Sequence, residues 1–194
     1  MTISEKIDTT PQKLDNHSAG KIIEVISPYL DNIHLVAEFT DVYARQVPFY
    51  KSYKLFSFTD RTKFPAESHF VLYRPGHVQP LDWGHHAIYE ANKIAPIFLT
   101  KDNVADYVRF FFALVRNKVE RIHLVEKIAD VPFITEPEEH VNEQIKSLIQ
   151  PLFIDKDSSK TNFELSATVM FRDGLFSTSI GVRLDGRVQI YNQT

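Results

Sequence analysis

Strict alternation of apolar and polar residues marks the last third of the chain. Apolar side chains occupy every second position over residues 163–171 and, with one threonine, over 176–184. Successive side chains of a strand point to opposite faces, so this period predicts strands with one apolar face. Turn residues follow each run, at 172–174 and 185–186, and the pattern resumes at Val188. The sequence therefore predicts a C-terminal antiparallel meander of three strands.

The most apolar helical pattern covers residues 100–118. Thr100 is the expected N-cap, and Arg116 and Lys118 suit the C-terminal end of the helix dipole. The apolar positions repeat at helical spacing: Val104, Tyr107, Val108, Phe110, Phe111, Phe112, Leu114 and Val115. Only a narrow polar strip remains, so we expect this helix to have partners on two sides or to lie at a subunit interface.

Shorter patterns predict the other elements. The N-terminal region predicts a short helix at residues 22–26 and a second helix that begins at Ser27-Pro28 and runs toward Arg45, although residues 32–39 also fit a strand. Strands are expected at 54–59, 69–73 and 121–128, and a helix is expected after the capping box formed by Thr135 and Glu138.

This order of elements predicts an α+β fold, because helices must cover the apolar face of an antiparallel sheet. A cone-like arrangement of helices around the sheet is one option. Residues 1–17 are polar and are predicted to form a flexible arm, and residues 18–194 are predicted to form a single domain. A chain of 194 residues is long enough to bury a core without covalent staples.

Composition narrows the class of protein further. The absence of cysteine excludes disulfides, thiolate catalysis and cysteine-ligated metals. The polar N-terminus lacks the apolar segment of a signal peptide, and no apolar run approaches the length of a membrane span, so we expect a soluble, cytoplasmic protein. A net charge of -3 gives no reason to expect nucleic acid or an anionic membrane as a partner.

One segment concentrates candidate chemistry: LDWGHHAIYEAN, residues 81–92. It suggests a ligand pocket formed by Asp82, Trp83, His85, His86 and Tyr89. Adjacent histidines diverge on both strands and helices, and no HExxH pattern is present, so no metal is predicted. The main interpretation is a structural turn in which the indole packs and the histidines are solvated.

Signatures of catalysis and cofactor binding are missing. The chain has no G-x-S-x-G elbow, no phosphate-binding glycine loop and only six glycines, so no cofactor is expected. The polar face of the C-terminal meander carries small side chains, many of them with hydroxyl groups, and few charges, as interfaces often do. We therefore expect a non-catalytic protein that binds a partner or assembles with itself. The expected assembly is a homodimer, formed through this face or through the helix at 100–118. The alternative is a small-molecule-binding protein or enzyme with a pocket around residues 82–89.

Overall fold

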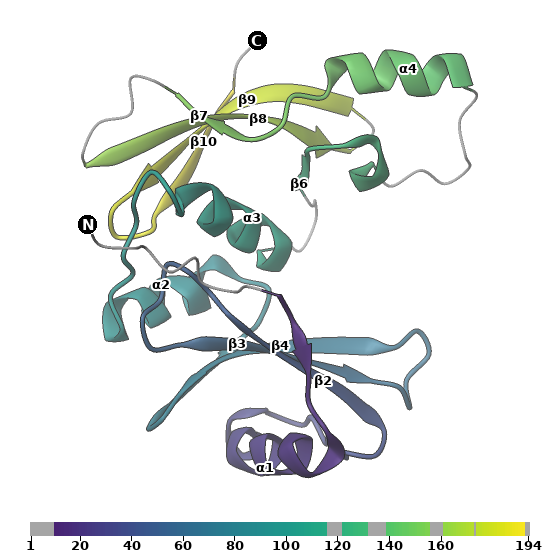
Figure 1. The fold of residues 1–194 in the computed structure, drawn as a ribbon, viewed down its shortest axis with the longest axis vertical. Coiled ribbons are helices and arrows are strands. Elements are labelled where there is room, and N and C mark those ends of the chain that lie inside the picture. Colours follow the sequence, from purple (N-terminus) through teal and green to yellow (C-terminus); the bar gives the residue numbers. More distant parts are fainter. Residues whose placement is uncertain (1–9, 116–121, 132–138, 156–160, 173, 193–194) are drawn as a thin grey trace, which may run out of the picture. The chain divides into compact units, whose positions relative to one another are not determined.

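A computed structural model describes residues 10–115, 122–131, 139–155, 161–172 and 174–192. Contacts divide the chain into two compact units: an N-terminal unit of Met1–Asp82 and His86–Pro96, and a C-terminal unit of Trp83–His85 and Ile97–Thr194. Each unit has an antiparallel sheet of its own, which confirms the predicted α+β class (Figure 1). Whether the two units fold as a single domain stays a prediction, as does the cone-like arrangement.

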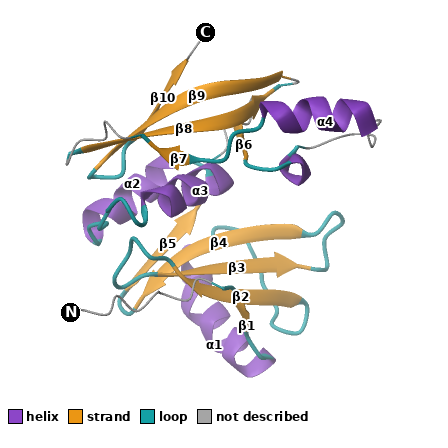
Figure 2. Ribbon diagram, turned by 45° about the horizontal axis from the view of Figure 1, so that its top comes forward, coloured by secondary structure: helices purple, strands orange, loops and turns teal. Residues whose placement is uncertain are grey.

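The N-terminal unit is a five-stranded sheet in sequence order with helices on both sides (Figure 2). Its elements are β1 (Gln12–Lys13), α1 (Asn16–Ile26), the 3-10 helix η1 (Ser27–Tyr29), β2 (Thr40–Gln46), β3 (Lys54–Asp60), β4 (Glu67–Arg74), β5 (His77–Leu81) and α2 (His85–Ile94) apart from its first residue. The strands expected at 54–59 and 69–73 are confirmed within β3 and β4.

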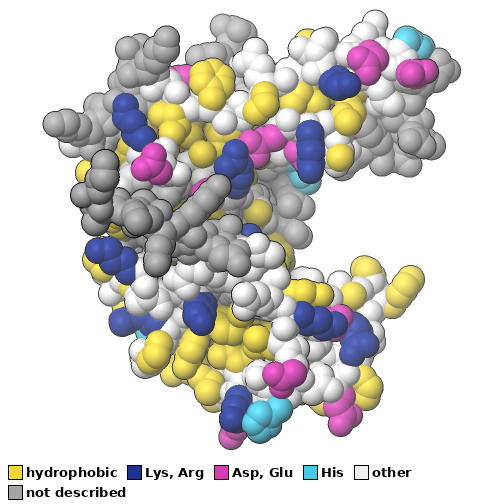
Figure 3. All heavy atoms as spheres, in the orientation of Figure 1, with side chains coloured by type: hydrophobic (Ala, Val, Ile, Leu, Met, Phe, Trp, Pro, Cys, Tyr) yellow, Lys and Arg dark blue, Asp and Glu magenta, His cyan; other side chains and the backbone are white. Residues whose placement is uncertain are grey.

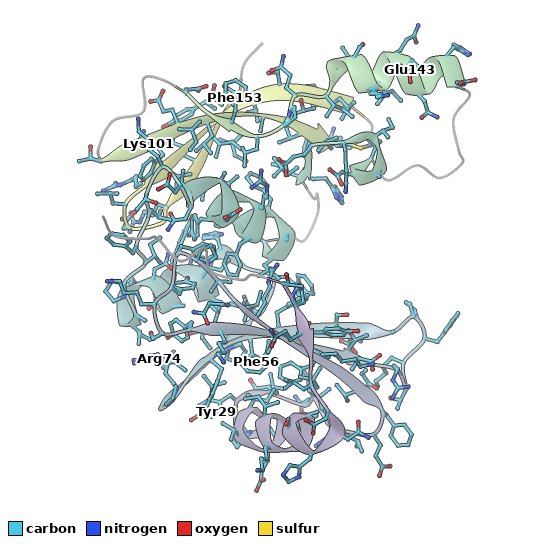
Figure 4. The ribbon with its side chains drawn as sticks, in the orientation of Figure 1. Tyr29, Phe56, Arg74, Lys101, Glu143 and Phe153 are labelled. Atoms are coloured by element: carbon cyan, nitrogen blue, oxygen red, sulfur yellow. The ribbon has the colours of Figure 1, made fainter. Side chains whose placement is uncertain are left out.

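Helix α1 covers one face of this sheet. The Asp15 side chain caps the helix by accepting a hydrogen bond of 2.9 Å from the Ser18 backbone N–H. The apolar residues of α1 pack with alternate residues of the sheet in one buried cluster: Ala19, Ile22, Ile23, Ile26, Leu30, Leu35, Val42, Phe56, Phe58, Val71 and Val78. Figure 4 labels Phe56 on β3, in the middle of this cluster. We refer to this side of the sheet as the α1 face.

The second helix predicted from Ser27-Pro28 toward Arg45 is wrong. Only the single 3-10 turn η1 forms there, and Asn32 then adopts the left-handed conformation (φ 57°). Residues 40–46 instead form β2, which pairs along its whole length with β3. Tertiary pairing overrides the helical start signal, because a proline at the first helical turn fixes only local geometry.

The segment assigned to the N-terminal arm contains regular structure. β1 pairs with β2 through Gln12 and Lys13, opposite Ala44 and Tyr43. Helix α1 begins at Asn16, so the boundary at residue 17 falls inside it. Residues 1–9 lie outside the described residues, and a flexible arm there stays a prediction.

The C-terminal unit contains the predicted meander, β8-β9-β10, with β6 and β7 also pairing with β8. Its elements are α3 (Val104–Leu114), β6 (Ile122–Val125), the 3-10 helix η2 (Ile128–Asp130), α4 (Glu139–Leu148), β7 (Phe153–Ile154), β8 (Asn162–Phe171), β9 (Gly174–Arg183) and β10 (Val188–Asn192). The capping box at Thr135 and Glu138 lies outside the described residues.

The alternation that predicted the meander corresponds to burial. Leu165 and Ile180 are opposite each other in β8 and β9, and both are fully buried. Phe163 and Val182 form a second buried pair. The pattern weakens at the beginning of β9, where Phe176 is 50% exposed.

Helix α3 supplies much of the apolar packing of this unit. The residues of its predicted stripe from Val104 to Leu114 are buried, and α3 contacts β6. The buried Tyr107 hydroxyl donates a hydrogen bond of 2.7 Å to the carbonyl of Gly186, in the β9–β10 turn. Gly186 has a φ of 81°, which favours glycine there. The helix is therefore joined to the meander by a specific polar contact as well as by apolar packing.

Part of the hydroxyl-rich strand face is occupied by the chain itself. Ser166 donates to the Asp155 carboxylate at 3.0 Å, and the Thr168 hydroxyl accepts from the Gln150 backbone N–H at 2.8 Å. These serine and threonine side chains hold the segment before and along β7 against β8. Their small size therefore has a structural reason that does not require a partner subunit.

The described helices are at most 11 residues long. A bilayer-spanning helix needs about 20 apolar residues, and none of the described helices meets that requirement.

Candidate ligand-binding site

The face of the N-terminal sheet opposite the α1 face contains a row of one small and two large side chains. In the strand register Ser57 of β3 lies between Tyr43 of β2 and Phe70 of β4. Residues opposite each other in an antiparallel sheet point to the same side. A serine between two aromatic residues leaves the middle of the row unfilled.

A hollow of about 230 Å³ lies over this row. The described residues that line it belong to the N-terminal unit: Pro11, Tyr43, Ala44, Arg45, Leu55, Ser57 and Phe70. We call it the Arg45 hollow. Pro11 precedes β1, whose pairing with β2 continues the sheet beside the hollow.

Arg45 provides the charge of this hollow. It is half-buried and lies opposite Leu55 in the register of β2 and β3. Its guanidinium has neither a hydrogen bond nor an ion pair with any of the described residues. Burial lowers the pKa of Arg45, because the charged form loses hydration without gaining a counterion. Arginine still remains protonated in proteins, so the hollow carries a positive charge.

The nearest acidic side chain on this face has other partners. Asp41 of β2 lies 2.8 Å from the Lys13 ammonium and 3.6 Å from the Arg61 guanidinium. The hydrogen bond from Lys13 holds the pKa of Asp41 below its usual range. Both basic groups are therefore paired with the Asp41 carboxylate, whereas Arg45 has no such partner among the described residues. Basic and acidic side chains are likewise interspersed on the surface shown in Figure 3.

A second polar cluster lies on the same face. The Tyr53 hydroxyl and His77 Nδ1 are 2.6 Å apart, and the Arg74 guanidinium carbon lies 5.8 Å from the centre of the Tyr53 ring. Figure 4 labels Arg74 at the end of β4. Burial raises the pKa of Tyr53, and burial together with the charge of Arg74 lowers the pKa of His77. Both rings are therefore neutral at pH 7. Tyr50 in turn donates a hydrogen bond to Asn92 of α2.

Acidification is expected to destabilise the N-terminal unit through His77. Its folded-state pKa lies below the ordinary 6.5, so the unfolded chain binds the proton first. The stability contribution is fully present above about pH 6.5 and declines as the pH falls through the folded-state pKa. Urea unfolding should be measured at about pH 7.5 and 5.5. The free energy of unfolding should fall less between these two pH values for His77→Gln than for the natural chain. Equal losses would contradict the assignment to His77.

The sequence-predicted site residues are not part of this hollow. Asp82, His85 and His86 are exposed, and Trp83 and Tyr89 are half-buried. Trp83 itself adopts the left-handed conformation in the turn before α2, with φ 65°. Trp83 and His85 group with the C-terminal unit and the other three with the N-terminal unit. A ligand pocket formed by these five residues stays a prediction.

Two other kinds of site, a metal centre and a basic surface on α3, find no support among the described residues. Within the described residues, no three histidine, aspartate or glutamate side chains are grouped to hold a metal ion. Arg109 of α3 makes two hydrogen bonds of 2.8 Å to the Glu126 carboxylate and one of 3.0 Å to Asp106. Its partners are within the chain, so it does not mark a binding surface.

Comparison with known proteins adds no functional assignment: no protein-family model, no curated protein and no solved structure matches the chain.

Sequence reasoning missed Tyr43, Arg45, Ser57 and Phe70 as site residues. The available signal was the segment KLFSFTD, where one serine interrupts an aromatic strand. Its importance depends on which residues lie opposite it, and assigning Arg45 to the end of a helix removed that information.

Proposed function

We propose that the N-terminal unit is a non-catalytic binding module that holds a small ligand in the Arg45 hollow. The observation that carries this proposal is the half-buried Arg45, which lacks an ionic partner among the described residues and lines an unfilled space. Withdrawing a charge from water costs free energy unless a partner compensates. A bound ligand is the compensation that this geometry favours.

The size of the hollow limits the ligand. Pockets for drug-sized molecules have volumes of about 300–1,000 Å³. The Arg45 hollow, at about 230 Å³, is smaller. It suits a small molecule, or one end group of a larger ligand.

The lining favours binding over catalysis. The described residues of the lining include no histidine, lysine or carboxylate. General acid–base catalysis needs a side chain that can exchange a proton near neutral pH, and nucleophilic use of a serine needs an adjacent base. Ser57 has no such base among the lining residues, so its hydroxyl is suited to donate or accept a hydrogen bond.

Filling the hollow should abolish ligand binding. A fragment library screened by NMR against the full chain should give saturable shifts of backbone amides in β2 and β3 around Arg45 and Ser57. Ser57→Phe places a large ring between Tyr43 and Phe70 and should remove these shifts, while circular dichroism and thermal unfolding check that the variant is folded. Ser57→Ala is the matched control and should retain them. Binding that persists in Ser57→Phe would overturn the proposal.

Two further sequence-based expectations accompany this proposal. A cytoplasmic location is supported by the absence of cysteine. A homodimer through the C-terminal sheet is supported by β10, the last strand of its sheet within the described residues, and by the exposure of Phe176 and Tyr191. Light scattering should then give about twice the 22.5 kDa chain mass, and Ser177→Lys, at an exposed position of β9, should lower it. A natural chain of monomer mass at micromolar concentration would reject the dimer.

A further inference from the structure

We propose that the ligand of the Arg45 hollow is a small organic carboxylate, bound with its carboxylate on the Arg45 guanidinium and its carbon body against Tyr43, Leu55 and Phe70. This inference rests on the proposed function and adds the chemical class of the ligand.

The charge of the site requires an anion. Among the described residues of the lining, Arg45 is the one ionisable cation, and none of them is acidic. Asp41, the carboxylate of β2 on the same face, is held by Lys13 at 2.8 Å and Arg61 at 3.6 Å. A neutral ligand would leave Arg45 uncompensated, and a cationic ligand would add repulsion.

The amount of charge favours a carboxylate over a phosphate group. A guanidinium presents parallel N–H donors that match the two oxygens of one carboxylate, with one charge on each side. A phosphate monoester carries a charge of about -1.5 to -2 at pH 7 and accepts through three oxygens. The described residues of the lining include no second basic group to balance it. Lys13, whose ammonium lies 5.9 Å from the centre of the Tyr43 ring, is engaged with Asp41.

A second donor stands beside the arginine. Ser57 lies two residue pairs along the sheet from the Arg45–Leu55 pair, and therefore on the same face. Its hydroxyl has no hydrogen bond to the described residues. It can therefore donate to the ligand carboxylate or to a polar substituent of the ligand.

The rest of the lining is suited to an apolar part of the ligand. Tyr43, Leu55, Phe70 and Pro11 present rings and an aliphatic side chain around the unfilled space. Burial of apolar surface favours a ligand with a hydrocarbon or aromatic body next to its carboxylate. Formate or acetate would satisfy the charge and leave this apolar surface unfilled.

NMR titrations with three probes test the assignment. Benzoate has the charge and the ring, benzyl alcohol has the ring alone, and inorganic phosphate has charge alone. Benzoate should give saturable shifts at residues 43–45, 57 and 70 of the full chain. Benzyl alcohol should bind at the same residues at least about tenfold more weakly, since it lacks the charge-assisted hydrogen bonds. Phosphate should not saturate them.

Variants separate the carboxylate assignment from binding as such. Arg45→Gln should lower the affinity for benzoate to that for benzyl alcohol. Arg45→Lys should lower the affinity for benzoate by an intermediate amount, because lysine retains the charge without the two parallel donors of the guanidinium. Arg61→Gln, which removes a neighbouring basic group that is engaged with Asp41, is the matched control and should leave benzoate binding unchanged. A well-dispersed amide spectrum of each variant confirms that it is folded.

Each contrary result has a defined meaning. If benzyl alcohol binds as tightly as benzoate, or if phosphate binds more tightly, the carboxylate assignment is wrong and the proposed binding function stands. If Arg45→Gln leaves benzoate binding intact, the assignment is also wrong. If no probe and no fragment shifts these residues, both the inference and the proposed function fall.

Discussion

Phe58→Ala is expected to lower the free energy of unfolding of the N-terminal unit by about 3–5 kcal/mol. Phe58 is fully buried on the α1 face, and its ring stacks on that of Phe56 at a centroid distance of 6.3 Å. Truncation removes its buried apolar area and leaves a cavity beneath α1, in a cluster that cannot collapse without moving the sheet. Urea unfolding followed by circular dichroism measures the loss.

The control for Phe58 is the same truncation at a less buried position of the same unit. Phe39 is 50% exposed, so Phe39→Ala should cost roughly 1 kcal/mol or less. If both variants lose the same free energy, the cluster beneath α1 is not the main source of stability in this unit.

The C-terminal meander was predictable because its signal is local. Alternation over residues 163–171 and 176–184 needs only the two-residue period of a strand, and turn residues fix where each strand ends. The same local evidence gave the helix in α3, where apolar residues cover most of the circumference. Fold class follows from such elements, and it was correctly predicted.

The N-terminal sheet was less predictable because its strands depend on pairing. β2 contains Asp41, Arg45 and Gln46, and nothing in its composition requires a strand until β3 lies beside it. β5 was not predicted, since Pro80 cannot donate a hydrogen bond, and β1 is only two residues long. Non-local contacts decide these elements, and a single sequence does not display them.

The candidate site shows the same limit more sharply. Histidines, a tryptophan and carboxylates attract attention wherever they cluster in sequence, as at residues 82–89. The Arg45 hollow is assembled from three consecutive strands, β2, β3 and β4, with Pro11, and its central feature is the small size of Ser57. A missing side-chain volume and an absent counterion become visible only when the register is known.

Leu165→Ala is expected to lower the free energy of unfolding of the C-terminal unit by about 2–5 kcal/mol. Leu165 is fully buried in β8, where it lies opposite Ile180 on one side and Ile154 on the other. Its truncation therefore opens a cavity at the centre of the sheet. Leu148, at the end of α4, is 64% exposed, so Leu148→Ala is the matched control. It should lower the free energy of unfolding by no more than about 0.5–1 kcal/mol.

Leu165→Ala and Phe58→Ala together test the prediction of a single domain. Amide hydrogen exchange should be measured on β3 and β8 in both variants, because it reports the opening free energy of each sheet separately. In a single cooperative domain, either substitution lowers protection in both sheets by the same amount. If Leu165→Ala weakens β8 and leaves β3 unchanged, and Phe58→Ala does the reverse, the units unfold independently and the single-domain prediction is wrong. The unfolding equilibrium then has to be described separately for each sheet.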